Sequence, residues 1–232
     1  MTERKSLYVF LDLDNTILDF AKAERTALAQ ALSERGVTPT DEMLCRYSEI
    51  NLACWEELEK GNWTRAEVLV RRYERLIAEF QLSLDAQEIQ RRYEQLLHEG
   101  HDILPGAEDL LKTLFARYEL YLASNGTDSE QRSRIEKSGI GKYFKEIFVS
   151  ERMGTVKPQR EFFEACFARI PGFEPSRAIM VGDSLTSDIR GGINAGIKTC
   201  WFNPEGKSLR EDIRPDYVIC SLDELPGILE RL

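Results

Sequence analysis

The chain has 232 residues, of which 42% are hydrophobic, and this is enough for one large domain or for a core domain with an insertion. Its formal charge of −9 argues against a nucleic-acid polymer as partner, because a protein that tracks a phosphate backbone needs a basic face. No apolar run approaches the roughly 20 residues of a membrane-spanning helix, and the first residues lack the apolar segment of a signal peptide, so we expect a soluble cytoplasmic protein without a membrane partner.

The first predicted element is a strand over residues 7–12, a continuously apolar run that ends at Asp12. A strand without polar alternation is typical of the centre of a parallel sheet, where helices cover both faces. The polar residues that follow, up to Thr16, are typical of a loop that leaves such a strand.

Residues 18–100 have helical periodicity and no convincing strand. Glycine and proline residues divide this segment, and Thr64 and Asp85 are suitable N-caps. These signals predict four helices, at about 18–35, 40–60, 64–80 and 85–99. We interpret residues 18–100 as an all-helical domain inserted after the first strand, and residues 1–17 with 101–232 as an α/β core domain.

After residue 100, short apolar runs alternate with helical patterns. The apolar runs predict strands at 118–123, 146–149, 178–181, 199–202 and 217–220. The helical patterns predict helices at 105–117, 128–138, 159–170, about 187–195 and 222–232. Alternation of this kind is typical of a doubly wound α/β fold, in which a parallel sheet lies between two layers of helices.

Two carboxylates, Asp12 and Asp14, follow the first strand at a spacing of two residues. On an extended backbone this spacing places both side chains on the same face, so they project into one cleft while Leu13 points to the core. Two like charges held together are costly unless a cation lies between them. The pair therefore predicts a hard divalent metal ion, for which Mg²⁺ is the best candidate because it prefers oxygen ligands.

Further polar residues follow the later strands. Ser124 and Asn125 end the second strand, Asp183 ends a later one, and Lys157 lies in a loop just before a predicted helix. In an open parallel sheet, ligands bind beyond the carboxyl ends of the strands. We therefore expect these residues to share one site with the first aspartate pair.

This set of side chains is suited to phosphoryl transfer through a covalent aspartyl-phosphate. One of Asp12 and Asp14 attacks phosphorus, and the other protonates the leaving alkoxide and later activates water; the spacing alone does not decide which. Lys157 neutralises the carboxylate and phosphoryl charges, which allows two anions to approach. Asp183 supplies a metal oxygen ligand from across the cleft.

Other residues are expected to bind phosphate or to support the site. The Ser124 hydroxyl and the main-chain N–H of Asn125 are suitable donors to a phosphoryl oxygen. Asp188, five residues after Asp183, is expected to hold the lysine or a metal-bound water in place. Thr16 is expected to support the site in the same indirect way.

These motifs, in this order, resemble those of haloacid dehalogenase (HAD) superfamily phosphatases with a helical type-1 cap inserted after the first motif. The resemblance covers essentially the whole chain and implies a Rossmann-like HAD core. It assigns Asp12 as nucleophile, Asp14 as general acid and base, and Ser124 and Lys157 to the second and third motifs. It also implies that Mg²⁺ is bound by Asp12, the Asp14 main-chain carbonyl and Asp183. Superfamily dehalogenases lack the second aspartate, so Asp14 favours phosphate esters over carbon–halogen bonds.

Six stretches, at 124–127, 149–151, 156–158, 182–184, 191–196 and 199–203, resemble bacterial pyrimidine 5'-nucleotidases. The expected substrate is therefore a small phosphomonoester, a nucleoside monophosphate. The alternatives are an N-acylneuraminate-9-phosphatase or other sugar-phosphate phosphatase, a phosphoglycolate phosphatase and, with less support, a phosphomutase or a non-enzymatic binding module. The oligomeric state stays open.

The inserted helical domain is expected to select the substrate. Tyr47, Trp55, Trp63 and Tyr73 are candidates for stacking on a base. Aromatic residues at helical spacing more often form the core of such a domain, so these four residues have two competing interpretations.

Overall fold

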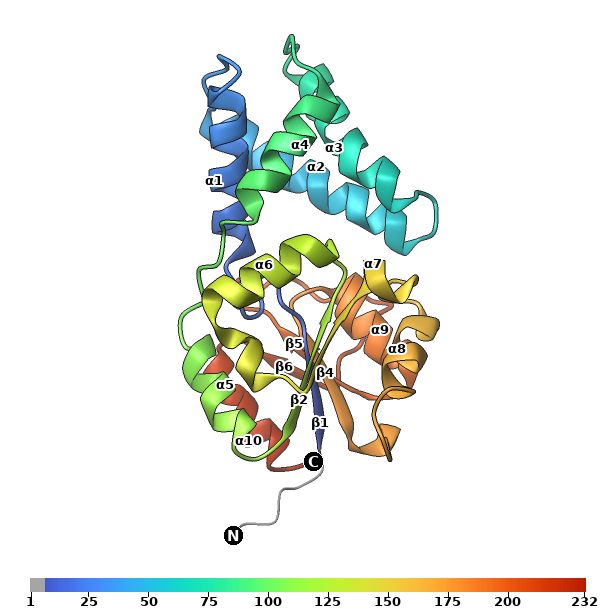
Figure 1. Cartoon of the computed structure of the whole chain (residues 1–232). Coiled ribbons are helices and arrows are strands. Elements are labelled where there is room, and N and C mark those ends of the chain that lie inside the picture. Colours follow the sequence, from blue (N-terminus) through green and yellow to red (C-terminus); the bar gives the residue numbers. More distant parts are fainter. Residues whose placement is uncertain (1–6) are drawn as a thin grey trace. The chain divides into compact units, whose positions relative to one another are not determined.

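The computed structural model describes residues 7–232, which form two compact units (Figure 1). The α/β unit joins the residues up to Asp19 to Ile103–Leu232, and the helical unit is Phe20–Asp102. These boundaries lie two residues further along the chain than the boundaries expected from the sequence.

The α/β unit is built on a six-stranded sheet with the order β3-β2-β1-β4-β5-β6, in which every neighbouring pair is parallel. The strands are β1 (Tyr8–Leu11), β2 (Glu119–Ser124), β3 (Glu146–Val149), β4 (Ala178–Gly182), β5 (Lys198–Phe202) and β6 (Tyr217–Ile219). Each lies within one residue of its predicted range at both ends. The predicted doubly wound parallel sheet is confirmed, with β1 in the interior between β2 and β4.

Alternate side chains of β1 enter two separate hydrophobic cores. Val9 and Leu11 belong to one core, and Tyr8 and Phe10 belong to the other. Figure 1 shows α5 (Ala107–Phe115), α6 (Asp128–Ser138) and α10 (Leu225–Leu229) on one face of the sheet, and α7 (Ser150–Met153), α8 (Arg160–Phe167) and α9 (Arg190–Ala195) on the other. Burial on both faces explains why the strand is apolar without alternation.

Several short helical turns were not predicted from the sequence. They are η1 (Ile140–Tyr143), α7, η2 (Pro175–Arg177) and the first residues of a π-helical turn, η3 (Leu185–Ile189). The helix expected at about 187–195 is this π turn followed by α9, and the last expected helix is η4 (Leu222–Glu224) followed by α10. Elements of three to five residues are too short to show a helical period in the sequence.

The helical unit contains four helices and, within Phe20–Asp102, no strand, as predicted. They are α1 (Phe20–Ser33), α2 (Asp41–Glu59), α3 (Arg65–Glu79) and α4 (Ala86–Leu97). Thr64 forms a reciprocal capping box with Glu67, and the Asp85 side chain accepts a hydrogen bond from the main chain of Glu88. Both predicted N-caps therefore satisfy backbone donors at a helix start.

The core of the helical unit combines aromatic rings with buried polar groups. The rings of Tyr47, Tyr73 and Tyr93 lie 5.4–5.8 Å apart between centroids. The Arg72 guanidinium lies over two of these rings and donates a hydrogen bond of 2.9 Å to Asn51, whose amide donates one of 2.7 Å to a buried glutamate of α1. A buried cation is thus linked to a buried anion through one amide.

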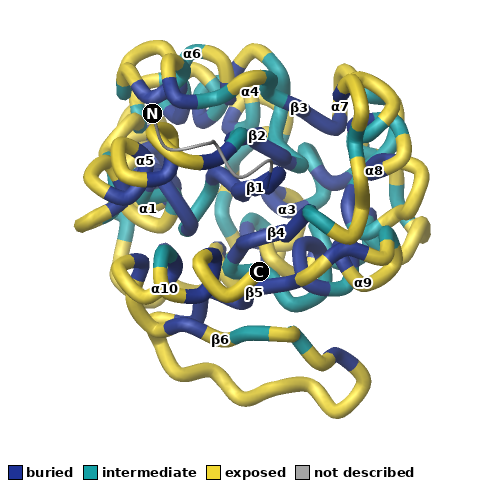
Figure 2. The backbone as a smooth tube through the Cα atoms, turned by 90° about the horizontal axis from the view of Figure 1, so that it is seen from below, coloured by how far each residue is buried: buried dark blue, intermediate teal, exposed yellow. Residues whose placement is uncertain are grey.

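The exposed residues of the α/β unit include most of the loop between β5 and β6, which is largely yellow in Figure 2, whereas the central strands are dark blue. The edge strand β6 has only three residues, and a short edge strand limits pairing with other chains. Within residues 7–232, no helix is both long enough and apolar enough to cross a membrane.

Candidate active site

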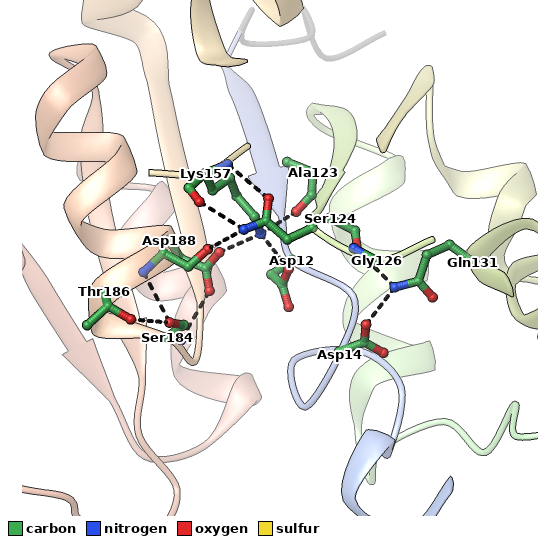
Figure 3. Close-up of polar contacts among 12 residues, drawn as sticks. Asp12, Asp14, Ala123, Ser124, Gly126, Gln131, Lys157, Ser184, Thr186 and Asp188 are labelled. Atoms are coloured by element: carbon green, nitrogen blue, oxygen red, sulfur yellow. Dashed lines mark hydrogen bonds and ion pairs between the residues drawn. The ribbon is translucent and has the colours of Figure 1, made fainter. Parts of the chain in front are cut away.

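The carboxyl ends of three adjacent strands bring the predicted residues together. Asp12 follows β1, Ser124 ends β2 and Asp183 follows β4. The main chain of Asp12 donates a hydrogen bond of 2.9 Å to the carbonyl of Val181, so the ladder between β1 and β4 continues to the first residue of the site. Because these strands are parallel neighbours, their carboxyl ends lie at the same edge of the sheet (Figure 3).

Lys157 lies at the centre of this edge and is almost completely buried, with 2% of its side chain exposed. Its Nζ lies 2.6 Å from Asp12 Oδ1, 2.6 Å from Asp188 Oδ1 and 2.6 Å from the carbonyl oxygen of Ala123. An ammonium group has three donors, and these three acceptors use all of them. The lysine therefore joins the first strand, the second strand and the π turn after β4.

Asp188 is held as tightly as the lysine. Its Oδ1 accepts from Lys157, and its Oδ2 accepts from the main-chain N–H of Ser184 at 3.1 Å. A Cβ atom on Gly182 would lie 2.1 Å from Asp188 Oδ2, so only glycine allows the carboxylate this close to the end of β4. These contacts agree with the expectation that Asp188 holds the lysine in place.

Asn125 connects the second strand to the lysine loop. Its side-chain oxygen accepts from the main-chain N–H of Lys157 at 2.9 Å, and its amide donates to the Lys157 carbonyl at 2.9 Å and to Ser187 Oγ at 3.2 Å. The Asn125 side chain thus fixes the backbone on both sides of the lysine. The sequence predicts that the main-chain N–H of Asn125 binds phosphate. The side-chain bonds do not involve this N–H, so its role stays a prediction.

The Ser124 hydroxyl is buried and already has two donors. It accepts hydrogen bonds from the main-chain N–H of Gly126 at 3.1 Å and from Gln131 Nε2 at 2.8 Å. A hydroxyl that accepts twice still has its own O–H to donate. Ser124 can therefore donate this proton to a phosphoryl oxygen without breaking either bond.

The carboxylate of Asp14 lies against helix α6. Gln131 Nε2 donates to Asp14 Oδ2 at 2.6 Å, as Figure 3 shows, and Arg134 donates to Asp14 Oδ1 at 2.5 Å. Asn15, the next residue, has a φ of 55°, which turns the chain away from the strand direction. Thr16 is fully buried, and within residues 7–232 its hydroxyl has no hydrogen-bond partner.

Gln131 and Arg134 were not recognised from the sequence. The signal was the buried face of α6, which carries Glu130, Gln131 and Arg134 and only one large apolar side chain, Ile135. A helix that covers a sheet normally buries an apolar stripe. A polar buried face directly after the second motif indicates that the helix contacts a polar site.

Negative charge exceeds positive charge in the centre of the site. Carboxylate oxygens of Asp12, Asp183 and Asp188 lie within 4.8 Å of one another, and the cation hydrogen-bonded to Asp12 and Asp188 is the Lys157 ammonium. Burial raises the pKa of Asp12 well above its usual range, although Lys157 lowers it. Burial and the charge of Asp188 raise the pKa of Asp183 to about 7.

Lys157 stays charged in this setting. Burial lowers the pKa of its ammonium, but the charges of Asp12 and Asp188 outweigh burial and leave the pKa above its usual value. Both oxygens of Asp188 are hydrogen-bonded, whereas the Asp183 carboxylate accepts no hydrogen bond within residues 7–232. A hard divalent cation that accepts oxygen ligands fits the remaining charge and the remaining lone pairs of Asp12 and Asp183.

The candidate aromatic residues of the helical unit fall into two groups. Tyr47 and Tyr73 are fully buried in the core of that unit, so they are not available to stack on a base. Trp55 and Trp63 are partly exposed, and arginine side chains lie over both rings at 4.6–5.4 Å from the centroids. The core interpretation is confirmed for the two tyrosines, and stacking on a base stays a prediction for the two tryptophans.

Comparison with known proteins identifies relatives that match almost the whole chain. The chain is 40% identical over 221 residues to the HAD-hydrolase YfnB of Bacillus subtilis (strain 168). The aligned region covers 95% of this chain and 94% of YfnB. It is 38% identical to the pyrimidine 5'-nucleotidase PynA of Streptococcus pneumoniae, in an alignment that covers 97% of this chain and 95% of PynA. It is 28% identical to the human N-acylneuraminate-9-phosphatase, in an alignment that covers 97% of this chain and 94% of that enzyme.

A solved structure has the same fold. A crystal structure of YfnB bound to magnesium superimposes with a TM-score of 0.92 at 39% identity and covers 97% of this chain and 98% of that chain. A family model described as haloacid dehalogenase-like hydrolase matches residues 9–202, a range that begins in β1 and ends with β5. The matched range contains all the predicted site residues, and the chain belongs to the haloacid dehalogenase-like hydrolase family.

Proposed function

We propose that this protein is a Mg²⁺-dependent phosphomonoesterase that forms an aspartyl-phosphate on Asp12. The observation that carries the proposal is the buried contact between Lys157 and Asp12, beside the Asp183 carboxylate and the Ser124 hydroxyl. A buried lysine compensates part of the negative charge at the nucleophile, so a phosphate dianion can approach. The Asp12 carboxylate is accessible only to a small extent, with 9% of its side chain exposed, as expected for a nucleophile in a protected site.

Asp12 and Asp183, with the main-chain carbonyl of Asp14, are the residues that would hold Mg²⁺. The chemistry supplied by the bound ion is neutralisation of carboxylate and phosphoryl charge. Asp188 lies within reach of the same oxygens, but its hydrogen bonds to Lys157 and Ser184 assign it to holding the lysine. Trp201 donates a hydrogen bond of 2.8 Å to the Asp183 carbonyl and so orients the loop that carries this ligand.

Hydrolysis takes two steps with opposite proton transfers. In the first, an Asp12 oxygen bonds to phosphorus, the phosphorus–oxygen ester bond breaks, and Asp14 gives a proton to the leaving alkoxide. In the second, water attacks the aspartyl-phosphate, the bond from phosphorus to the Asp12 oxygen breaks, and Asp14 takes the proton of the attacking water. Ser124 donates its O–H to a phosphoryl oxygen in both steps. Lys157, whose three donors are bonded to Asp12, Asp188 and the Ala123 carbonyl, offsets the phosphoryl charge through its own charge.

The proposed substrate is a nucleoside 5'-monophosphate. The similarity to a pyrimidine 5'-nucleotidase, at 38% identity, supports it more strongly than the 28% identity to an N-acylneuraminate-9-phosphatase supports a sugar phosphate. We assign substrate selection to the helical unit, where Trp55 and Trp63 combine a partly exposed ring with an adjacent guanidinium. A ring and a cation together suit a base and its polar edge.

The test is phosphate release from a panel of nucleoside monophosphates and sugar phosphates in the presence of Mg²⁺. We expect Asp12→Asn to abolish turnover while its thermal unfolding stays close to that of the wild type. The control is Asp109→Asn, the same substitution at an aspartate of α5 with 87% of its side chain exposed, which should leave kcat/KM unchanged. Turnover by Asp12→Asn at the wild-type rate would refute the mechanism.

The role of the metal has its own test. EDTA should abolish phosphate release, and added Mg²⁺ should restore it. Hydrolysis that continues at the same rate in EDTA would contradict the assignment of Asp183 as a ligand. A sugar phosphate with a higher kcat/KM than every nucleoside monophosphate would redirect the substrate proposal without affecting the mechanism.

A further inference from the structure

The Asp14 carboxylate has a separate donor for each oxygen. Gln131 Nε2 donates to Oδ2 at 2.6 Å, and Arg134 donates to Oδ1 at 2.5 Å. Both donors come from α6, one turn apart, and both are fully buried. The Asp14 side chain is 24% exposed, so one side of the carboxylate is held by the helix and another part reaches solvent.

The surroundings of Gln131 provide a second hydrogen-bond acceptor and enough space for its amide. Its Nε2 also donates to Ser124 Oγ at 2.8 Å, so one amide connects the first and second motifs. A Cβ atom on Gly126 would lie 2.1 Å from Gln131 Nε2 and 2.6 Å from its Cδ, so the glycine leaves the space that the amide occupies. Gly126 therefore cannot be replaced by a larger residue without moving the Gln131 amide away from Asp14.

Arg134 is bound to its helix as well as to Asp14. Its guanidinium donates to Gln131 Oε1 at 3.0 Å and lies 3.7 Å from Glu130 Oε1. Burying an arginine is costly, and an apolar residue at a position facing the sheet would stabilise the fold at lower cost. The carboxylate that this arginine contacts is the one assigned to proton transfer.

We propose that Gln131 and Arg134 are positioning residues that orient the Asp14 carboxylate for proton exchange with the leaving group and with water. The inference rests on the proposed function, because it assumes that Asp14 is the general acid and base. Two donors on two different oxygens fix the plane of the carboxylate, which one donor alone leaves free to rotate. Each oxygen keeps a second lone pair, so Asp14 can still carry and release a proton.

Arg134 orients Asp14 without replacing it. An arginine guanidinium does not deprotonate in proteins, so it does not compete for the transferred proton. Gln131 has no proton to transfer at ordinary pH either. The two residues therefore act through Asp14, and their loss should affect the steps in which Asp14 moves a proton.

The test compares two substrates that differ in their need for a proton. The alkoxide of a nucleoside 5'-monophosphate needs protonation as it leaves, whereas the p-nitrophenolate of p-nitrophenyl phosphate leaves without it. kcat/KM reports the steps up to release of the alcohol and so isolates the first proton transfer. The variants are Gln131→Met and Arg134→Met, with Asp14→Asn to define the full effect and Arg132→Met, an exposed arginine of α6, as the matched control.

We expect kcat/KM for the nucleotide to fall roughly 10- to 100-fold in both variants, a part of the roughly 10²–10⁴-fold contribution of general acid–base catalysis. kcat/KM for p-nitrophenyl phosphate should change by less than about threefold, and Arg132→Met should leave both values unchanged. Arg134→Lys, which restores one charged donor, should recover part of the loss. If Arg134→Met does not fold, Gln131→Met and Arg134→Lys carry the comparison.

Three results separate the possible failures. Equal losses for both substrates would mean that α6 only stabilises the loop that carries Asp14. Unchanged or faster nucleotide hydrolysis would mean that the helix does not orient Asp14. Either result overturns the inference while the proposed function stands. A wild-type protein that hydrolyses neither substrate with Mg²⁺ would refute the proposed function, and the inference with it.

Discussion

The stability of the protein without a metal ion should fall as pH rises. The pKa of Asp183 rises from 3.8 to about 7 in the fold, chiefly through burial and the charge of Asp188. The folded protein therefore holds this proton more tightly than the unfolded chain. The free energy of unfolding then decreases between about pH 4 and about pH 7, because ionisation of the folded protein becomes costly in this range.

The size of this effect follows from the two pKa values. The rise from 3.8 to about 7 corresponds to at most about 4 kcal/mol, at roughly 1.4 kcal/mol for each pKa unit. Asp12, whose pKa is also raised, adds a contribution of the same sign. Mg²⁺ binds the ionised carboxylates, so the stability gained on adding Mg²⁺ should increase over the same range of pH.

The assay is urea unfolding at several pH values, with EDTA or with Mg²⁺. Trp201 is the only tryptophan of the α/β unit, so its fluorescence in a Trp55→Phe, Trp63→Phe background follows that unit alone. Asp183→Asn should reduce both the decline with pH and the stabilisation by Mg²⁺. A metal-free stability that stays constant between pH 4 and pH 7, or equal stabilisation of Asp183→Asn by Mg²⁺, would refute this reasoning.

Three substitutions test the supporting contacts. Gly182→Ala places a Cβ 2.1 Å from Asp188 Oδ2, so we expect a loss of roughly 1–3 kcal/mol in urea unfolding and a lower kcat. Trp201→Phe removes the donor to the Asp183 carbonyl, which should cost about 1 kcal/mol and weaken Mg²⁺ binding in calorimetry, with little change in the fold. Arg72→Met removes a buried cation from the helical unit and should destabilise that unit by about 3–5 kcal/mol, measured by circular dichroism during urea unfolding.

The strands and the larger helices were predictable because their signals are local. β1 is buried on both faces and therefore apolar throughout, and a helix such as α3 has a buried apolar stripe at helical spacing after a capping box. The short turns were not predictable, since an element such as η3 has only five residues, too few to show a helical period.

The expectation of one shared site rested on a general property of parallel sheets. Asp12, Ser124 and Asp183 lie far apart in the chain, but each follows a strand, and β2, β1 and β4 are neighbours. The carboxyl ends of such strands lie at one edge of the sheet, and this does not depend on the conformation of the loops. The lysine was placed in the site by its order among the motifs, and Asp188 was expected to hold it or a metal-bound water. No local pattern indicated that its three donors bond Asp12, Asp188 and the Ala123 carbonyl.

The sequence by itself determined the parallel α/β core, the helical insertion and the set of acidic, hydroxyl and basic groups at the strand ends, because these depend on local periodicity and strand order. Only the tertiary structure decided which groups touch: Lys157 between Asp12 and Asp188, and Asp14 against Gln131 and Arg134. Contacts between side chains that lie far apart in the chain depend on packing angles and turn geometry. A single sequence does not encode these in a local pattern, so α6 was not recognised as part of the site.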